Sequence, residues 1–210
     1  MNAQTMRQVV RGPAGELECA VDAPQDGVIG TAVICHPHPL HGGTLDNKVV
    51  QTLARACVQL GWRSVRFNFR GVGASQGLWD DGVGEVADCL AVIGAVHVAG
   101  QPLLLAGFSF GGFVAAQAAQ EPRVASALRR LVLVGPSTQK QQLPPVPANA
   151  VVIHGESDDV VPLQATLDWA RPQSLPVIVF PGVGHFFHGQ LALLKRVLVR
   201  ELCEPAHADV

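Results

Sequence analysis

The segment LLLAGFSFGGFVAA places a serine where it could act as a nucleophile. Gly107, Ser109 and Gly111 form the pattern G-x-S-x-G between an apolar run and a segment rich in small residues. In a sharp turn from strand to helix, this pattern holds a serine in strained backbone geometry, and the glycines leave room for the neighbouring chain. The alternative is an ordinary serine at a helix N-terminus, flanked by glycines that serve packing. The position between a strand and a helix favours the nucleophile.

A nucleophilic serine requires a base and an acid, and both residue types follow it in the chain. A serine hydroxyl is a weak nucleophile until an imidazole accepts its proton and a carboxylate orients that imidazole. VVIHGESDDVVP contains Asp158 and PVIVFPGVGHFFHG contains His185, each just beyond a predicted strand. The carboxyl ends of parallel strands meet at one edge of a sheet, so these residues are expected beside Ser109. The order Ser, Asp, His predicts acyl-transfer chemistry.

The segment CHPHPLHGGTLDNK contains His36, His38 and His41, and it permits two interpretations. A metal site is one, but two prolines stiffen the turn and no carboxylate or cysteine is spaced to complete the ligand set. The other is a loop after a strand that supplies a backbone N–H to an oxyanion hole. Because proline lacks an N–H, the donor would be His38 or, alternatively, Leu40, and the second donor would be Phe110. We predict the oxyanion loop and no metal.

The elements that must position these residues alternate between short apolar runs and longer helical patterns. Strands are expected at 31–36, 64–69, 103–108, 131–135, 151–155 and 176–180, with helices at 47–61, 82–96, 110–120, 161–170 and 190–202. Pro122 is expected to end the third helix, and residues 16–21 to form an antiparallel edge strand. Continuous apolar runs indicate strands buried on both faces. The sequence therefore predicts one α/β domain over residues 1–210, with a mostly parallel central sheet and helices on both faces.

Composition and charge narrow the class of partner. The chain has 15 Lys and Arg against 17 Asp and Glu, scattered rather than massed, which argues against nucleic acid and anionic lipid. The first ten residues do not resemble a signal peptide, and no apolar stretch reaches the roughly 18 residues of a membrane span. Five cysteines without a CxxC pair favour reduced thiols. We expect a cytoplasmic protein without a cofactor, a monomer or small homo-oligomer that acts on a small molecule.

Taken together, these segments resemble the α/β-hydrolase superfamily, and within it the small bacterial serine esterases that lack a lid. The matching stretches are CHPHPLHGGTLDNKVV, RFNFRGVGASQG, GFSFGG, HGESDDVVP and GVGHFFH, and the resemblance extends over nearly the whole chain. It implies an α/β-hydrolase fold without a cap domain. It also implies Ser109 as nucleophile, His185 as base and Asp158 as acid. Family loops often read H-G-x-x-G where this chain has H-P-H-P.

The same resemblance chooses between neighbouring candidates. The family pattern H-G-x-x-D-x-x-V-P favours Asp158 over Asp159, and the family histidine follows a G-x-G turn directly, which favours His185 over His188. Asp159 is then expected as a solvated acid and His188 as a residue at the rim of the site.

The expected substrate follows from what the chain lacks. Only PSTQKQQLPPVPANA, fifteen residues with four prolines, stands where the superfamily inserts a cap, so we expect an open site for short-chain or exposed esters. Thioester, amide and acyl-peptide hydrolysis on the same triad remain alternatives, as does a non-catalytic binding protein. Phe186 and Phe187 are expected to border the substrate pocket. Arg70 is expected to tie its loop by a salt bridge or backbone hydrogen bonds, with substrate binding as the alternative.

Overall fold

Eight strands form one sheet in the computed structural model, which describes residues 5–203. The strands are β1 (Met6–Gly12), β2 (Gly15–Asp22), β3 (Gly30–Cys35), β4 (Trp62–Phe67), β5 (Leu103–Phe108), β6 (Leu128–Val134), β7 (Val151–Gly155) and β8 (Val177–Phe180). Their order across the sheet is β1-β2-β4-β3-β5-β6-β7-β8. Strand β2 pairs antiparallel with both of its neighbours, β1 and β4, whereas the pairs from β4 to β8 are all parallel. The predicted mostly parallel sheet is therefore confirmed.

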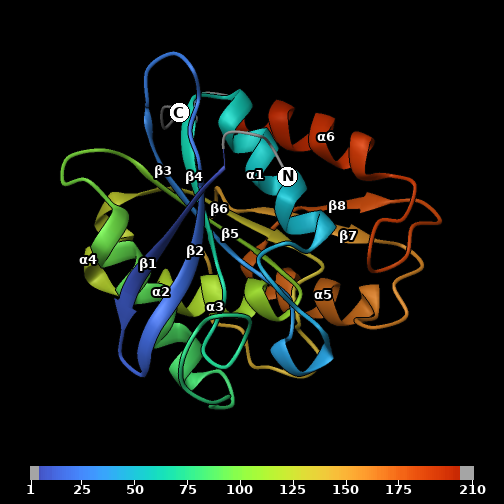
Figure 1. Cartoon of the computed structure of the whole chain (residues 1–210). Helices are drawn as coiled ribbons and strands as arrows, with labels where there is room; N and C mark the ends of the chain where they lie inside the picture. Colours follow the sequence, from blue (N-terminus) through green and yellow to red (C-terminus); the bar gives the residue numbers. More distant parts are fainter. Residues whose placement is uncertain (1–4, 204–210) are drawn as a thin grey trace.

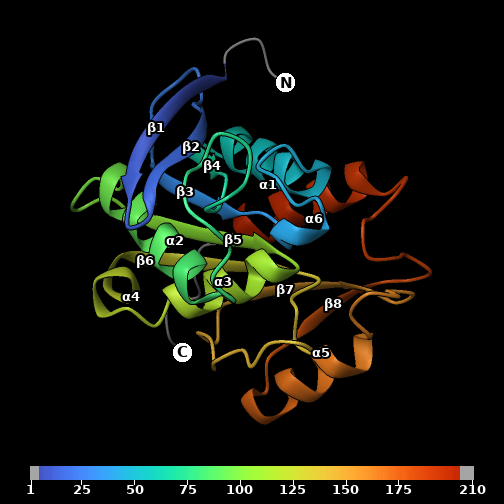
Figure 2. The same ribbon diagram turned by 60° about the horizontal axis from the view of Figure 1, so that its bottom comes forward.

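Helices cover both faces of this sheet (Figures 1 and 2). They are α1 (Lys48–Gln59), α2 (Val83–Val96), α3 (Phe110–Ala118), α4 (Pro122–Ala127), α5 (Leu163–Ala170) and α6 (Leu191–Cys203), with short 3-10 turns at Pro39–His41 and Arg171–Gln173. Helices α1 and α6 lie together on one face, and α2 and α3 lie on the other (Figure 2). None of the helices within residues 5–203 is long and apolar enough to cross a membrane.

Two hydrophobic cores follow from this layering, one on each face of the sheet. In β5, Leu104, Ala106 and Phe108 belong to the core beneath α1 and α6, whereas Leu103 and Leu105 belong to the core beneath α2 and α3. Side chains alternate along a strand, so a strand covered on both sides must be apolar at every position. This explains why the central strands read as unbroken apolar runs.

Two expectations about element boundaries were wrong. Residues 16–21 do form an antiparallel strand, but β2 is not at the edge, because β1 pairs along its whole length. Five of the seven β1 residues are exposed, so the segment MRQVVRG carries little apolar signal. Pro122 does not simply end the third helix: α3 stops at Ala118, and Pro122 begins α4. Proline suits the first turn of a helix, where its missing N–H costs nothing.

The connection between β6 and β7, residues 136–150, contains turns and irregular chain but no helix. Several hydrogen bonds hold it against its neighbours, and three of them involve its proline-rich stretch. The carbonyl oxygens of Pro144 and Pro145 accept from Trp169 Nε1 at 3.3 Å and from Gln120 Nε2 at 3.0 Å, and the Val146 N–H donates to Gln173 Oε1 at 2.8 Å. The connection therefore packs on the sides of the domain, and the domain has no cap.

Candidate functional site

Ser109 lies at the turn between β5 and α3, with a strained backbone. Its φ is +57° and its ψ is −120°, a conformation that a residue with a side chain adopts only under constraint. A Cβ at Gly107 would overlap the carbonyl oxygen of Gly111, and a Cβ at Gly111 would overlap that of Cys35. The Ser109 side chain makes no hydrogen bond to the helix that it precedes. It is therefore not an ordinary N-cap serine, and its hydroxyl is not used to stabilise α3.

Asp158 and His185 form a close pair at the same edge of the sheet. His185 Nδ1 and Asp158 Oδ2 are 2.6 Å apart, and the other carboxylate oxygen accepts the N–H groups of Val160 and Val161 at 2.9 and 2.8 Å. Burial alone would raise the pKa of Asp158, but the hydrogen bond from His185 and those from Val161 and Val160 lower it below its usual range. The side chain is thus a carboxylate at neutral pH.

The loops that carry this pair are tied to each other. The Ser157 N–H donates to the carbonyl of Val183 at 3.0 Å, and the Gly182 N–H donates to Glu156 Oε2 at 2.7 Å. A Cβ at Gly155, the last residue of β7, would overlap the carbonyl of Val183. The two loops therefore fix the relative position of acid and imidazole.

Contacts around the end of β6 link the segments that carry Ser109 and His185. The Ser109 N–H donates to the carbonyl of Val134 at 2.9 Å, and the next residue, Gly135, faces both His185 and Asp158. The ring of Phe108 lies 4.9 Å from that of His185, centroid to centroid. No side-chain hydrogen bond joins Ser109 to His185 within the described residues. Serine and imidazole are often further apart in free enzymes than in the substrate complex.

Two backbone N–H groups without a partner in the described chain flank the site, one in the loop after β3 and one directly after Ser109 at the start of α3. Within residues 5–203, the N–H groups of His38 and Phe110 have no hydrogen-bond partner. The Leu40 N–H instead donates to His38 Nδ1 at 3.3 Å, so the alternative donor is already occupied. The geometry therefore favours His38 and Phe110 as the two donors, as the prolines suggested.

Trp79 supports this loop, a contact that the sequence did not identify. Its ring lies 4.6 Å from that of His38 and 5.1 Å from that of Phe110. Three scattered tryptophans gave no reason to separate Trp79 from the core. Trp62 packs in the core under α1 and α6, and both Trp79 and Trp169 pack against the core on the opposite face.

The three clustered histidines have different surroundings. His36 is fully buried, donates from Nδ1 to the carbonyl of Pro37 at 2.7 Å and accepts the Phe69 N–H at Nε2 at 3.1 Å. His38 is partly buried against Trp79, and His41 is exposed. No group of three His, Cys, Asp or Glu side chains within residues 5–203 is arranged to hold a metal ion. His36 therefore connects the ends of β3 and β4, a structural role.

His36 makes folding stability depend on pH. Burial lowers its pKa to about 3, against the opposing effect of the hydrogen bond to Pro37. Above about pH 6.5 both states are neutral; below it the unfolded chain binds a proton that the folded chain excludes, until about pH 3. This one group should lower the free energy of unfolding by about 1.4 kcal/mol per pH unit in that window. Urea denaturation between pH 4 and 7 measures the free energy of unfolding of the wild type and of His36→Gln. This free energy should fall less steeply with decreasing pH in the variant. An equally steep fall in both proteins would contradict the assignment.

Arg70 ties its loop to helix α2, as predicted. Its Nε and Nη2 donate to the two oxygens of Asp88 at 3.0 and 2.8 Å, and its backbone N–H donates to the same carboxylate at 3.0 Å. Gly84 leaves no room for a Cβ beside the guanidinium. A salt bridge or backbone hydrogen bonds were expected for this loop, and both are present. The salt bridge already engages the guanidinium that substrate binding would need.

The two phenylalanines after His185 have opposite environments. Phe186 is 44% exposed, with its ring 5.1 Å from that of His185. Phe187 is fully buried, and its ring packs 5.4 Å from that of Phe180 in the core under α1 and α6. The expectation that Phe187 borders a substrate pocket is therefore wrong: its φ of +53° turns the side chain into the core, where it anchors the loop. Only Phe186 remains at the rim.

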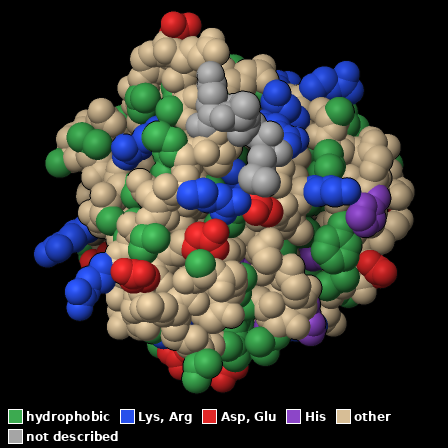
Figure 3. Space-filling view, in the orientation of Figure 1, with side chains coloured by type: hydrophobic (Ala, Val, Ile, Leu, Met, Phe, Trp, Pro, Cys, Tyr) green, Lys and Arg blue, Asp and Glu red, His purple; other side chains and the backbone are tan. Residues whose placement is uncertain are grey.

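His188 and Asp159 lie outside the close pair. Both side chains are exposed, and the His188 ring stacks near that of Phe186 at 5.8 Å. In Figure 3, histidine and hydrophobic side chains lie close together at the right-hand edge, where the loop after β8 runs. The structure thus places His185, and not His188, against Asp158.

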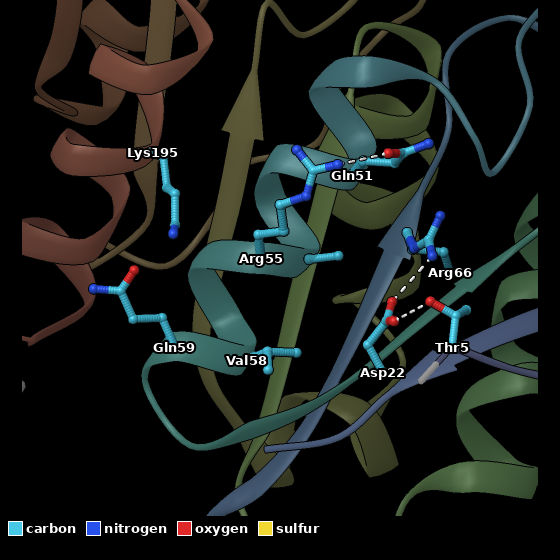
Figure 4. A pocket seen from close by; sticks show the side chains of 9 residues that line it. Thr5, Asp22, Gln51, Arg55, Val58, Gln59, Arg66 and Lys195 are labelled. Atoms are coloured by element: carbon cyan, nitrogen blue, oxygen red, sulfur yellow. Dashed lines mark hydrogen bonds and ion pairs between the residues drawn. The ribbon is translucent and has the colours of Figure 1, made fainter. Parts of the chain in front are cut away.

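Of two hollows in the surface, one adjoins the candidate site and the other lies away from it. One of about 560 Å³ has His185, Phe186, Asp159 and His188 among its lining residues, so it adjoins the close pair. Another of about 310 Å³ lies between α1, α6 and strands β2 and β4 (Figure 4). Arg55, Arg66 and Lys195 contribute to it, together with Asp22, which forms an ion pair with Arg66. None of its lining residues is a predicted site residue.

Comparisons with known proteins agree with this fold. A family model described as the alpha/beta hydrolase fold matches residues 33–150. An uncharacterized protein of Rickettsia prowazekii is 30% identical over 193 residues, which cover 84% of this chain and 79% of that protein.

Two solved structures are similar over nearly their whole length. An alpha-beta serine hydrolase homologue from Coxiella burnetii is 41% identical, with a TM-score of 0.84, covering 94% of this chain and 97% of that one. A serine hydrolase without a lid from Xanthomonas campestris is 36% identical, with a TM-score of 0.86, covering 96% of this chain and 95% of that one. With its strained serine, its Asp158–His185 pair and its uncapped sheet edge, the chain therefore belongs to the α/β-hydrolase fold family, among its serine hydrolases without a lid.

Proposed function

We propose that the chain hydrolyses short-chain or exposed carboxylic esters through an acyl-enzyme on Ser109, with His185 as base and Asp158 as acid. The observation that carries the proposal is the strained Ser109, whose side chain makes no hydrogen bond to helix α3, at the sheet edge that also holds the His185–Asp158 pair. Strained side chains persist where the surrounding structure maintains them, and they cluster at active sites.

The reaction has two acyl-transfer steps. His185 Nε2 accepts the Ser109 proton as Oγ attacks the ester carbonyl, and the same imidazole then gives that proton to the leaving alcohol. Water repeats the sequence on the acyl-enzyme, releasing the acid and restoring the serine. Asp158 holds the Nδ1 proton of His185 and stabilises the imidazolium that forms in each step.

The developing oxyanion requires donors that are not already bonded. The free N–H groups of His38 and Phe110 meet this condition, one in the loop after β3 and the other directly after the serine. Loss of one such donor typically costs about 10²- to 10³-fold in rate. Because both donors belong to the backbone, their side chains can vary without removing them.

The open edge of the sheet supports the choice of substrate. Residues 136–150 contact α5 and α3, so this connection does not cover the edge of the sheet as a cap would. The similar serine hydrolase from Xanthomonas campestris also has no lid. A shallow site favours substrates whose ester is accessible without burial of a long chain.

A panel of p-nitrophenyl esters tests this proposal. The value of kcat/KM should be highest for acetate or butyrate and lower for a long-chain homologue, and a fluorophosphonate probe should label the active enzyme. Matched thioester and anilide substrates show which bond the enzyme prefers.

Several outcomes would overturn the proposal. A strong preference for long acyl chains would contradict the open site, and faster hydrolysis of the thioester or anilide would replace the esterase assignment by another hydrolase. An enzyme that neither hydrolyses these substrates nor reacts with the probe would instead be a binding protein of the same fold.

A further inference from the structure

Strand β7 places a second histidine next to the proposed acid. His154 is fully buried and points to the same face of the sheet as Val152, the face covered by α2 and α3. Its Nε2 atom lies 2.8 Å from the carbonyl oxygen of Val161 and 3.4 Å from Asp158 Oδ2. The same Oδ2 atom accepts from His185 at 2.6 Å. The carboxylate of Asp158 therefore lies between two imidazoles.

The contact with Val161 determines the tautomer of His154. A carbonyl oxygen only accepts hydrogen bonds, so the proton of a neutral His154 must be on Nε2. Within the described residues, Nδ1 is buried and has no hydrogen-bond partner. The ring thus uses its only N–H at the point where Val161 and Asp158 converge, and it leaves its other nitrogen unsatisfied.

His154 can donate this hydrogen bond without carrying a charge. Burial lowers its pKa, and the nearby His185 acts in the same direction, while Val161 and Asp158 oppose them. A positive charge at this position would compete with the imidazolium that Asp158 must stabilise during acyl transfer. A neutral N–H holds the carboxylate with less effect on its charge.

We propose that His154 is a positioning residue: its Nε2–H, shared between Val161 and Asp158, fixes the carboxylate and moderates how strongly that carboxylate holds the proton of His185. The role rests on the proposed function, because it concerns the acid of the same triad. His154 itself does not touch the substrate.

Few other charged groups near His154 could account for a change in the pH dependence of activity. The titratable groups that act on His154 are Asp158 and His185. The neighbouring strands β6 and β8 face β7 with apolar residues, Val179 lying opposite His154, and the buried residues of α5 are Thr166 and Ala170. A shift in pH dependence on replacing His154 can therefore be traced to the Asp158–His185 pair.

Two substitutions separate positioning from packing. His154→Phe removes the donor, so more negative charge remains on Asp158 Oδ2, the oxygen that also contacts His185. The acid limb of the kcat/KM profile should move up by about one pH unit, and the plateau should fall by about tenfold. His154→Gln keeps an N–H near the position of Nε2 and should return the limb toward the wild-type position. An unmoved limb in folded His154→Phe, or an equal shift in both variants, would overturn the proposal.

Nitrogen NMR of the wild-type enzyme gives a measurement that does not require activity or a folded variant. His154 should carry its proton on Nε2 and remain neutral from pH 5 to 8. A proton on Nδ1, or titration within that range, would refute the assigned role. The ester panel tests the proposed esterase function, and the NMR measurement tests the protonation of His154. The two proposals can therefore fail separately.

Discussion

Replacing Ser109 by alanine should lower kcat for p-nitrophenyl acetate by about 10⁶-fold without disturbing the fold. The variant lacks the oxygen that forms the acyl-enzyme, and neither His185 nor the free N–H groups can replace it. Stability should change by less than about 0.5 kcal/mol, because the hydroxyl makes no hydrogen bond to α3 and alanine meets the same backbone strain. Steady-state kinetics, fluorophosphonate labelling and urea denaturation measure these effects.

Ser137→Ala is the matched control for this experiment. Ser137 is also a buried serine, and its backbone N–H donates to the carbonyl of Ser109 at 3.2 Å, a bond that the substitution retains. The control should keep its labelling and most of its activity. Substantial hydrolysis by folded Ser109→Ala would mean that another group is the nucleophile.

Asp158→Asn should reduce kcat/KM by about 10⁴-fold. The amide oxygen can still accept the N–H groups of Val160 and Val161, but the amide NH₂ then faces His185 Nδ1. To accept a hydrogen bond from that NH₂, the imidazole must move its proton to Nε2, the nitrogen that should receive the serine proton. The variant keeps its side-chain volume and loses the correct tautomer.

Asp159→Asn provides the comparison, because Asp159 is adjacent in sequence and exposed. Its kcat/KM should stay within about twofold of the wild type, as for most surface substitutions. Activity should be measured over the same pH range for both variants. A large loss in Asp159→Asn with little change in Asp158→Asn would reverse the assignment of the acid.

The central strands, and the positions of Ser109, Asp158 and His185 just beyond three of them, were predictable because their signals are local. Apolar runs identify strands that are buried on both faces, and β5 coincides with its predicted range 103–108. Strand β1 escaped prediction because its residues are mostly exposed, and it is held by backbone pairing with β2 rather than by burial. That pairing depends on the folded position of β2.

The finer details of the site depended on backbone conformation. Phe186 and Phe187 are chemically identical neighbours, and only the positive φ of Phe187 decides which ring enters the core. The choice between His38 and Leu40 depends on His38 Nδ1, which accepts the Leu40 N–H. The contact of His154 with Asp158 likewise appears only once the chain turns back at Val161.

The buried ring of Phe187 also bears on how the enzyme loses activity. Surface loops with few buried contacts open locally, at a small fraction of the free energy that unfolds a domain. The loop after β8 cannot open in this way without withdrawing a fully buried ring from the core, two residues from His185. The loop that carries His185 should therefore unfold together with the whole domain. We therefore expect thermal inactivation to coincide with global melting rather than to precede it.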